Sequence, residues 1–432
     1  MKKSPIKNAA VLGAGVMGAQ LSGLFANKGI KTYLFDISIE LASSGRDRLK
    51  TIKPAPLENP ENIDLIIPCC YDTDMEKIIE ADWVLEAIAE DLDIKLNLYD
   101  RLIPFLKDSA ILTTNTSGIT QKELSQNFSL DLKNRFMLTH FFNPPRYMRL
   151  LELVKGENTS TETYNTISNF GKDVLEKGIV PAKDTPNFIG NRVGVFGLMS
   201  TINIAMEMGM NIETVDALTG TICGRPKSAT FRTADVIGLD VLKNVAMTTY
   251  QKSNNDESVK MFNIPETMSF LIQKGNLGQK TKAGFYKKDE NGNILVLDLD
   301  SRTYRPIEKI DIELDSHIIQ SGTIDQRINA LINLDSKNGE FFWDILSQML
   351  LYCANRVPEI SDNINDIDNA MKWGFGWEVG PFEIWEMIGL SKSIKRMNSE
   401  NKLVPNWVIA LLEQEKNIFI RSEINNKKYY RT

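Results

Sequence analysis

The sequence is poor in the residues and patterns that mark several classes of protein. Its 432 residues include only four cysteines, and no two of them form a C-x-x-C pair, so we expect neither a disulfide framework nor a zinc site. No stretch approaches the roughly 18 apolar residues of a membrane-spanning helix. Positive charge is not in excess either, because the formal net charge is −6. Since phosphate backbones are bound by basic surfaces, nucleic acid is not an expected partner.

A secretion signal is also missing at the N-terminus. The sequence MKKSPIKN begins with charge, but glycines at positions 13, 15 and 18 interrupt the apolar stretch that follows. This interruption is typical of a nucleotide-binding loop and not of a signal-peptide core. Together with the unpatterned cysteines, which indicate reduced thiols, it predicts a cytoplasmic protein without a bound metal ion.

What the first 182 residues do contain is an alternation of short apolar runs and helical patterns. A helix is predicted over residues 16–28, with Gly29 ending it. Strands are predicted at residues 9–12, 31–35, 64–67, 83–88, 110–113, 136–141 and 150–154. Strands that alternate with helices are typical of a largely parallel α/β sheet, so residues 1–182 are expected to form a Rossmann-type domain.

The rest of the chain has mostly helical patterns. We expect a first helical domain over residues 183–288 and a second over residues 323–432. The polar stretch between them, residues 289–322, is expected to be a strand-poor linker with a candidate hairpin around Asn291–Gly292.

The two helical blocks share internal spacings. Each has a Val/Ile-Asp pair, ending at Asp216 in the first block and Asp368 in the second. Each then has a phenylalanine, Phe231 or Phe382, with a Gly-Leu pair seven residues after it. Generic helix punctuation is one explanation of these matches, but the repeated spacings favour duplication of one helical unit.

The segment VLGAGVMG contains the pattern G-x-G-x-x-G at Gly13, Gly15 and Gly18. It follows a predicted strand, opens a predicted helix, and precedes an acidic residue, Asp36, at the end of the next strand. This context is the dinucleotide fingerprint, whereas the glycines alone would also suit an ordinary turn without a ligand. The helix N-terminus would bind the pyrophosphate, and Asp36 would accept ribose hydroxyls and repel a 2′-phosphate, which favours NAD over NADP.

The chain has only two histidines, His140 and His317. His140 ends an apolar run that reads as a strand, and Glu152 lies twelve residues later in a neighbouring strand-like run. Oxidation of a secondary alcohol needs a base near neutrality for the hydroxyl proton, and a carboxylate on the far imidazole nitrogen would stabilise the imidazolium. His317 lies in a polar segment and is expected to be a solvated surface residue.

Taken together, these residues resemble the 3-hydroxyacyl-CoA dehydrogenase family over nearly the whole chain. The stretch HFFNPPRYMRLLELVKG is similar to the family's catalytic segment, which implies that His140 is the base and Glu152 its partner. The stretch TTNTSG resembles the family's N-T-S-S motif, which implies that Ser117 hydrogen-bonds the 3-oxygen of the substrate. In DTPNFIGNR, Asn191 falls on the family's substrate-binding asparagine.

The resemblance also implies further contacts with NAD. The segment VLEAIAEDLDIK places Glu90 and Lys95 on family positions that contact this cofactor. Asn143, three residues after the base, is similar to a nicotinamide-side contact, and LGQKTKAGFY places Lys280 on another cofactor contact.

These residues also have structural alternatives. Ser117 is suited to cap a helix that starts directly after it, and Asn191 to tie down the first turns of the long helix. Lys95 is suited to a surface charge pair with Asp91, and exposed lysines such as Lys280 commonly have no ligand.

The chain departs from the family at three places. Gly118 replaces the second serine of N-T-S-S, and Gly224-Arg225-Pro226-Lys227 replaces the usual G-x-G-x-P-x-G-P-F turn. The segment after Asp36 is also short of the family's basic CoA-binding helix, which leaves the basic residues at positions 48, 50 and 53 as loose candidates for the CoA phosphates.

The resemblance implies oxidation of (S)-3-hydroxyacyl-CoA to 3-oxoacyl-CoA with NAD⁺, a step of fatty-acid β-oxidation. It is strongest to a bacterial branch in which two helical units precede an enoyl-CoA hydratase. No hydratase is expected within these 432 residues, so a separate hydratase is a candidate partner, and both a monomer and a homodimer stay open. The alternatives are a β-hydroxyacid dehydrogenase of free acids and a catalytically weak dinucleotide-binding or docking subunit.

Overall fold

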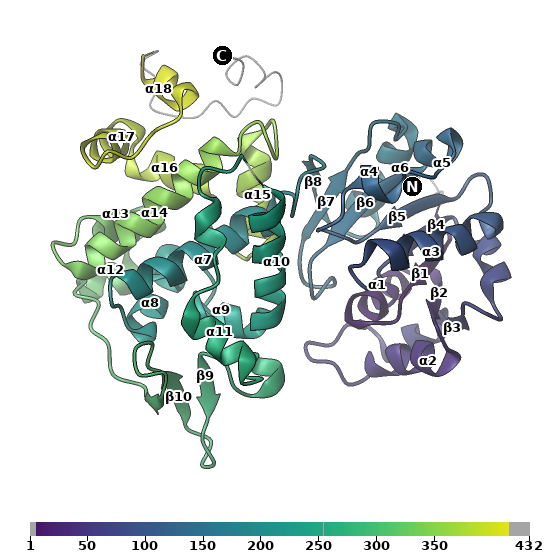
Figure 1. The fold of residues 1–432 in the computed structure, drawn as a ribbon, viewed down its shortest axis with the longest axis horizontal. Coiled ribbons are helices and arrows are strands. Elements are labelled where there is room, and N and C mark those ends of the chain that lie inside the picture. Colours follow the sequence, from purple (N-terminus) through teal and green to yellow (C-terminus); the bar gives the residue numbers. More distant parts are fainter. Residues whose placement is uncertain (1–5, 254, 414–432) are drawn as a thin grey trace. The chain divides into compact units, whose positions relative to one another are not determined.

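The computed structural model describes residues 6–253 and 255–413. The contacts of the chain divide it into two units, Met1–Phe188 and Ile189–Thr432. A helix-covered sheet forms the first unit and mostly helices form the second, which confirms the expected fold class (Figure 1). The expected domain boundaries at residues 182, 288 and 322 stay a prediction. Residues 1–5 of the expected first domain and residues 414–432 of the expected last domain lie outside the described residues.

An eight-stranded sheet forms the first unit, in the order β3-β2-β1-β4-β5-β6-β7-β8. Neighbouring strands are parallel except β6 and β7, which are antiparallel. Because β1 lies between β2 and β4, the order reverses there, and a ligand crevice is expected beyond its carboxyl end. The strands are β1 (Asn8–Leu12), β2 (Lys31–Asp36), β3 (Ile66–Cys70), β4 (Trp83–Glu86), β5 (Ile111–Thr114), β6 (Phe136–Phe141), β7 (Leu150–Val154) and β8 (Gly178–Ala182).

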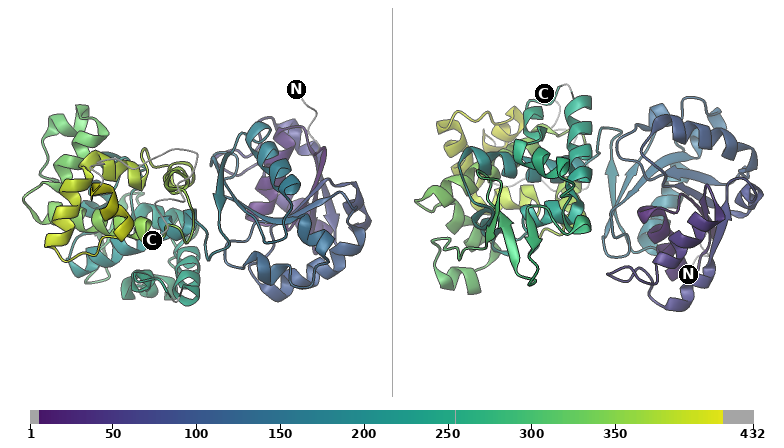
Figure 2. Two further views of the ribbon diagram at one scale, coloured as in Figure 1. Left: turned by 90° about the horizontal axis from the view of Figure 1, so that it is seen from above. Right: turned by 60° about the horizontal axis from the view of Figure 1, so that its bottom comes forward.

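Helices cover both faces of this sheet (Figures 1 and 2). Alternate residues of β1 point to opposite faces. Val11 belongs to a core cluster that includes residues of α1 and α6, while Ala10 and Leu12 belong to a second cluster that includes residues of α3, α4 and α5. Strands buried on both faces explain why the sequence shows continuous apolar runs here. The helices are α1 (Val16–Asn27), α2 (Ile39–Arg48), α3 (Leu92–Leu102), α4 (Gln121–Leu124), α5 (Leu130–Asn134) and α6 (Thr161–Asp173).

The second unit is built from helices and one small sheet. Its first helices are α7 (Gly190–Glu207), α8 (Ile212–Leu218), α9 (Phe231–Ile237), α10 (Leu239–Lys252) and α11 (Glu266–Gln273). After the small sheet follow α12 (Ser316–Ser321), α13 (Ile324–Ile332), α14 (Lys337–Asn355), α15 (Ile364–Gly374), α16 (Pro381–Ile388), α17 (Leu390–Ser399) and α18 (Asn406–Glu413).

The duplication inferred from spacing has a counterpart in the structure. Asp216 in α8 accepts a hydrogen bond from the backbone N–H of Phe231 at 2.8 Å, and Asp368 in α15 accepts one from Phe382 at 2.8 Å. Each carboxylate therefore holds the start of the matching helix, α9 or α16. A glycine with positive φ follows each helix: Gly238 after α9, with a φ of 95°, and Gly389 after α16, with a φ of 83°. In both places a leucine then starts the next helix.

The expected linker, residues 289–322, contains two short strands, which pair with a third strand that ends just before it. Strands β9 (Tyr286–Lys288), β10 (Ile294–Leu297) and β11 (Tyr304–Pro306) form an antiparallel sheet. The hairpin at Asn291–Gly292 joins β9 to β10, as expected, and Gly292 has a φ of 84° that suits a turn. Strands of three or four residues such as these are too short to show an alternating pattern in the sequence.

Several features are absent from residues 6–253 and 255–413. No helix there combines the length and the apolar character that a membrane crossing requires. The same residues contain no group of three or more His, Cys, Asp or Glu side chains that could hold a metal ion. All four cysteines are described, and none forms a disulfide.

Candidate functional site

The loop between β1 and α1 depends on two of the three fingerprint glycines for its shape. Gly13 has a φ of +101°, and a Cβ there would lie 2.7 Å from the carbonyl oxygen of Ala87. A Cβ on Gly18 would lie 1.8 Å from the carbonyl oxygen of Gly13. The tight turn and the close packing of helix on loop therefore both exclude a side chain.

Gly15 has a different role in the same loop. It is the N-cap of α1, and a Cβ built on it would meet nothing within 4 Å. No side chain caps this helix, and its first turn contains no acidic residue. The N-terminus of α1 therefore has no side-chain cap and has open space beside Gly15, an arrangement that suits a phosphate group.

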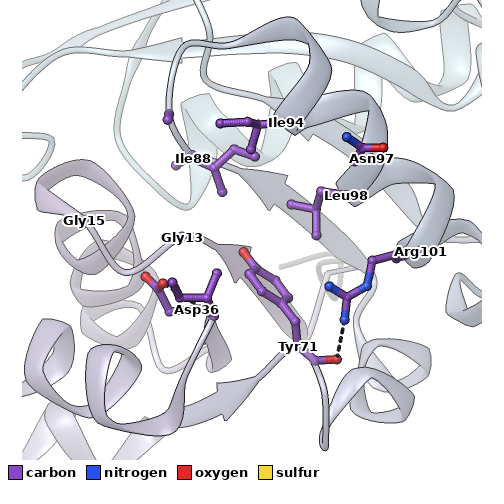
Figure 3. Close-up of a pocket in the computed structure, with 12 residues that line it drawn as sticks. Gly13, Gly15, Asp36, Tyr71, Ile88, Ile94, Asn97, Leu98 and Arg101 are labelled. Carbon is purple, nitrogen blue, oxygen red and sulfur yellow. Dashed lines mark hydrogen bonds between the residues drawn. The ribbon is translucent and has the colours of Figure 1, made fainter.

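Asp36 ends β2 beside this loop and has a fixed orientation. One carboxylate oxygen accepts the N–H of Ala14 and the other accepts the N–H of Ile37, both at 2.8 Å. Asp36 lines a cavity of about 650 Å³ together with Gly13 and Gly15 (Figure 3). The sequence-predicted fingerprint residues thus lie around one cavity at the carboxyl end of β1.

Asn143 lies close to the other side of the glycine loop. Its side-chain oxygen accepts a hydrogen bond from Gln20 Nε2 in α1 at 2.9 Å. Asn143, Gln20 and Gly15 line a second cavity of about 340 Å³, together with the basic residues Arg48 and Lys53. Because Gly15 lines both cavities, an extended ligand that crosses the helix N-terminus would reach from Asp36 toward Asn143.

His140 and Glu152 face one another across the antiparallel strands β6 and β7, in direct register. The imidazole Nδ1 lies 2.7 Å from Glu152 Oε2. The Glu152 side chain is fully buried, and that of His140 is 8% exposed. The second ring nitrogen, Nε2, has no partner among the described residues, so the pair presents one nitrogen for proton transfer.

Aromatic rings and an asparagine hold the histidine in place. The rings of Phe142 and Phe188 contact the imidazole edge-on, with centroids 4.6 and 5.7 Å away. Asn115, directly after β5, accepts a hydrogen bond from the backbone N–H of Phe141 at 2.9 Å. The sequence analysis did not predict these supporting residues. The only local sign of a role for Asn115 was its position in the motif TTNTSG, two residues before Ser117.

Glu90 shapes the loop that carries Ser117. Its carboxylate accepts the backbone N–H of Ser117 at 3.2 Å and of Gly118 at 2.7 Å, and also the hydroxyl of Thr116. The helix-cap alternative for Ser117 was wrong, because the next helix, α4, is capped by Thr120. The loop is therefore fixed by an acidic residue from the β4–α3 connection.

Lys95 lies in the interior of the first unit. Its side chain is 1% exposed, and its Nζ is 2.6 Å from an oxygen of the fully buried Glu86 and 3.7 Å from Glu90. The alternative of a surface pair with Asp91 was wrong, because Asp91 caps α3 instead. Glu86 further accepts the hydroxyls of Tyr99 and Thr114 at 2.9 and 2.6 Å.

The remaining two predicted residues belong to the second unit. Asn191 lies in the first turn of α7, whose N-cap residue is Ile189. Lys280 lies in a single 3-10 turn, with its Nζ 2.6 Å from the carboxylate of Asp240 in α10.

Comparisons with known proteins decide the family. Residues 8–185 match the 3-hydroxyacyl-CoA dehydrogenase NAD binding domain, and residues 188–288 match the C-terminal domain of the same family. A Deinococcus radiodurans protein named "Probable 3-hydroxyacyl-CoA dehydrogenase" is 39% identical over 293 residues, which cover 66% of this chain and 84% of that protein. The chain belongs to the 3-hydroxyacyl-CoA dehydrogenase family.

One further relative and one solved structure extend the likeness beyond residue 288. A Bacillus subtilis protein with the same printed name is 40% identical over 446 aligned positions, which cover 98% of this chain but only 56% of that protein. The crystal structure of 3-hydroxybutyryl-CoA dehydrogenase from Escherichia coli aligns with a TM-score of 0.72 over 95% of this chain and 99% of that one. At 23% sequence identity, this alignment shows a shared fold alone.

The first unit of this 3-hydroxyacyl-CoA dehydrogenase family member fits NAD. The open space at Gly15 and the uncapped start of α1 suit a pyrophosphate. The fixed carboxylate of Asp36 suits the adenosine ribose. NAD is therefore the cofactor that both the matched domain and the residues of the loop indicate.

Proposed function

We propose that this chain oxidises (S)-3-hydroxyacyl-CoA thioesters to 3-oxoacyl-CoA with NAD⁺. The observation that carries the proposal is the His140–Glu152 pair, joined at 2.7 Å on adjacent strands of the sheet whose β1–α1 loop has the dinucleotide fingerprint. Such a pair supplies a base with a fixed tautomer, which proton removal from an alcohol requires.

In the proposed reaction the substrate hydroxyl gives its proton to His140 Nε2, because Nδ1 faces Glu152. The carboxylate holds the imidazole orientation and stabilises the imidazolium that forms. The family resemblance assigns Ser117 and Asn191 to hydrogen bonds with the 3-oxygen. NAD⁺, when bound, would accept the hydride that leaves the carbon bearing this oxygen.

The substrate class is tested by comparing a thioester with the matching free acid. With NAD⁺, we expect NADH to form from (S)-3-hydroxybutyryl-CoA and from longer thioesters in a chain-length series, and not from (S)-3-hydroxybutyrate. Turnover of the free acid with none of the thioester would instead favour a β-hydroxyacid dehydrogenase. Tight NADH binding without turnover of any substrate would favour a catalytically weak binding or docking subunit.

Asp36 is expected to set the preference between NAD and NADP. Its carboxylate can accept ribose hydroxyls but repels a 2′-phosphate, so NADH should bind at least about tenfold more tightly than NADPH, the equivalent of ~1.4 kcal/mol. The Asp36→Asn variant should lose most of this difference, mainly through weaker NADH binding. Fluorescence titrations of both dinucleotides measure it; equal affinities in the unaltered chain would contradict the assignment.

The other expectations from the sequence stay predictions. They are a separate enoyl-CoA hydratase as partner, a monomeric or homodimeric state, and a cytoplasmic location. Co-purification with a hydratase tests the first of these without bearing on the dehydrogenase activity.

A further inference from the structure

Tyr71 lines the cavity beside Asp36 and takes no part in the reaction proposed for His140. It directly follows β3, and its backbone N–H donates to the carbonyl of Asp36 at 3.1 Å. Its ring stacks on that of Phe35, with centroids 5.9 Å apart and an interplanar angle of 13°. Tyr71 is only 6% exposed, and its hydroxyl end points toward Gly13 (Figure 3).

The Tyr71 hydroxyl is buried, and among the described residues it makes no hydrogen bond of regular geometry. The nearest backbone donor, the N–H of Gly13, bonds the carbonyl of Phe35 at 2.9 Å instead. A buried hydroxyl that makes no hydrogen bond costs stability, and most buried polar atoms in native proteins are paired. Phenylalanine would keep the stacking on Phe35 without this cost. The hydroxyl is therefore not explained by the packing of the unit.

The surroundings keep this hydroxyl in its donor form. Burial raises the pKa of Tyr71 far above its ordinary value and the negative charge of Asp36 raises it further, whereas the nearby backbone N–H of Gly13 lowers it by a smaller amount. A protonated hydroxyl next to the glycine loop can donate one hydrogen bond to an acceptor that enters the cavity.

The shape of the cavity identifies that acceptor. Apolar side chains of Ile37, Ile88 and Leu98 form walls that suit a flat base. Asp36 marks the ribose position, and the pyrophosphate position at Gly15 separates this cavity from the one that Asn143 lines. The ligand half in contact with Tyr71 is therefore the adenosine half.

We propose that the Tyr71 hydroxyl is a cofactor-binding group, which donates a hydrogen bond to the adenosine half of NAD. The inference rests on the proposed function, since NAD is the ligand of this cavity. Tyr71 contributes to dinucleotide affinity and takes no part in proton or hydride transfer, which belong to the His140 end of the ligand.

The Tyr71→Phe variant separates this role from a structural one. A neutral hydrogen bond corresponds to about a fivefold change in affinity, so the dissociation constants of NADH and ADP-ribose should both rise about fivefold. The affinity for reduced nicotinamide mononucleotide, which lacks the adenosine half, should not change. In steady-state kinetics the loss of affinity should appear as a higher KM for NAD⁺. In the absence of ligand the variant should unfold at the same or a higher temperature, because no protein hydrogen bond is lost.

Tyr33→Phe is a matched control in the same sheet. Tyr33 is 2% exposed, and its hydroxyl bonds the carboxylate of Glu80 and not a ligand cavity. This variant should bind NADH normally and lose stability, the reverse of the pattern expected for Tyr71→Phe.

Three results bear against the proposal in different ways. Unchanged NADH and ADP-ribose affinities in Tyr71→Phe, with tight binding by the unaltered chain, overturn the role of the hydroxyl alone. A lower unfolding temperature of the ligand-free variant assigns the hydroxyl to the fold instead. Failure of the unaltered chain to bind either ligand overturns the cofactor assignment and, with it, the proposed function.

Discussion

Replacement of His140 by glutamine is expected to lower kcat by roughly 10³-fold, within the range by which general acid–base catalysis contributes to enzymatic rates. The variant loses the nitrogen that accepts the hydroxyl proton. NADH affinity should stay nearly unchanged, because the imidazole is paired with Glu152 and not with the dinucleotide loop. Steady-state kinetics with (S)-3-hydroxybutyryl-CoA and a fluorescence titration with NADH measure the two quantities.

Glutamine is the informative substitution because Glu152 is fully buried. A side-chain amide can still donate a hydrogen bond to this carboxylate, whereas alanine would leave a buried charge without its partner and destabilise the unit. Loss of turnover in His140→Gln can therefore be separated from loss of folding.

The second histidine of the chain offers a matched control. His317 is exposed in α12, so His317→Gln should leave kcat, NADH affinity and unfolding temperature unchanged. Near-normal turnover in His140→Gln would remove the pair from the proposed mechanism. A similar loss in both variants would point to a general effect of the substitution.

The sequence predicted strands β6 and β7 over their observed ranges because every residue of both strands is buried. Such strands appear as uninterrupted apolar runs, in which His140 and Glu152 stand out. Their direct pairing was not predictable from the twelve-residue spacing. It depends on the register, and a slip by one residue would turn one side chain to the opposite face of the sheet.

Other strands could not be located correctly from the local sequence pattern. Strand β8 was not predicted, because it has five residues and includes Pro181, a residue that counts against a strand. It pairs with β7 next to Glu152 and closes the sheet on that side. Strand β3 was predicted too early, since residues 64 and 65 belong to a 3-10 helix with proline at its start and the strand continues to Cys70.

Polar residues in the interior were the hardest to predict. Lysine and tyrosine side chains give no local sign of burial, because the partner that satisfies them is set by the folded chain. Lys95 occupies a helix position with the local pattern of a surface charge, and the structure instead pairs it with buried Glu86. The family resemblance assigns Lys95 to a contact with NAD, whereas the structure gives it a buried ion pair with Glu86. Substitution of Lys95 is expected to give different results in these two cases.

Replacement of Lys95 by methionine is expected to destabilise the first unit by about 3 kcal/mol, the lower end of the cost of removing one partner from a buried ion pair. Glu86 would keep its neutral donors, including Tyr99 and Thr114, but lose the only cation within 2.6 Å among the described residues. Hydrogen exchange of the amides of β1 and β4, which lie in the centre of the sheet, measures this free energy.

The surface lysine Lys77 is the matched control for this variant. It pairs with Asp74 at 2.7 Å and is 37% exposed, so Lys77→Met should cost no more than about 1 kcal/mol. A second substitution, Glu86→Gln, should restore part of the stability of Lys95→Met, because it removes the unpaired buried charge. If Lys95→Met instead weakens NADH binding while hydrogen exchange stays unchanged, Lys95 contacts the cofactor as the family resemblance implies.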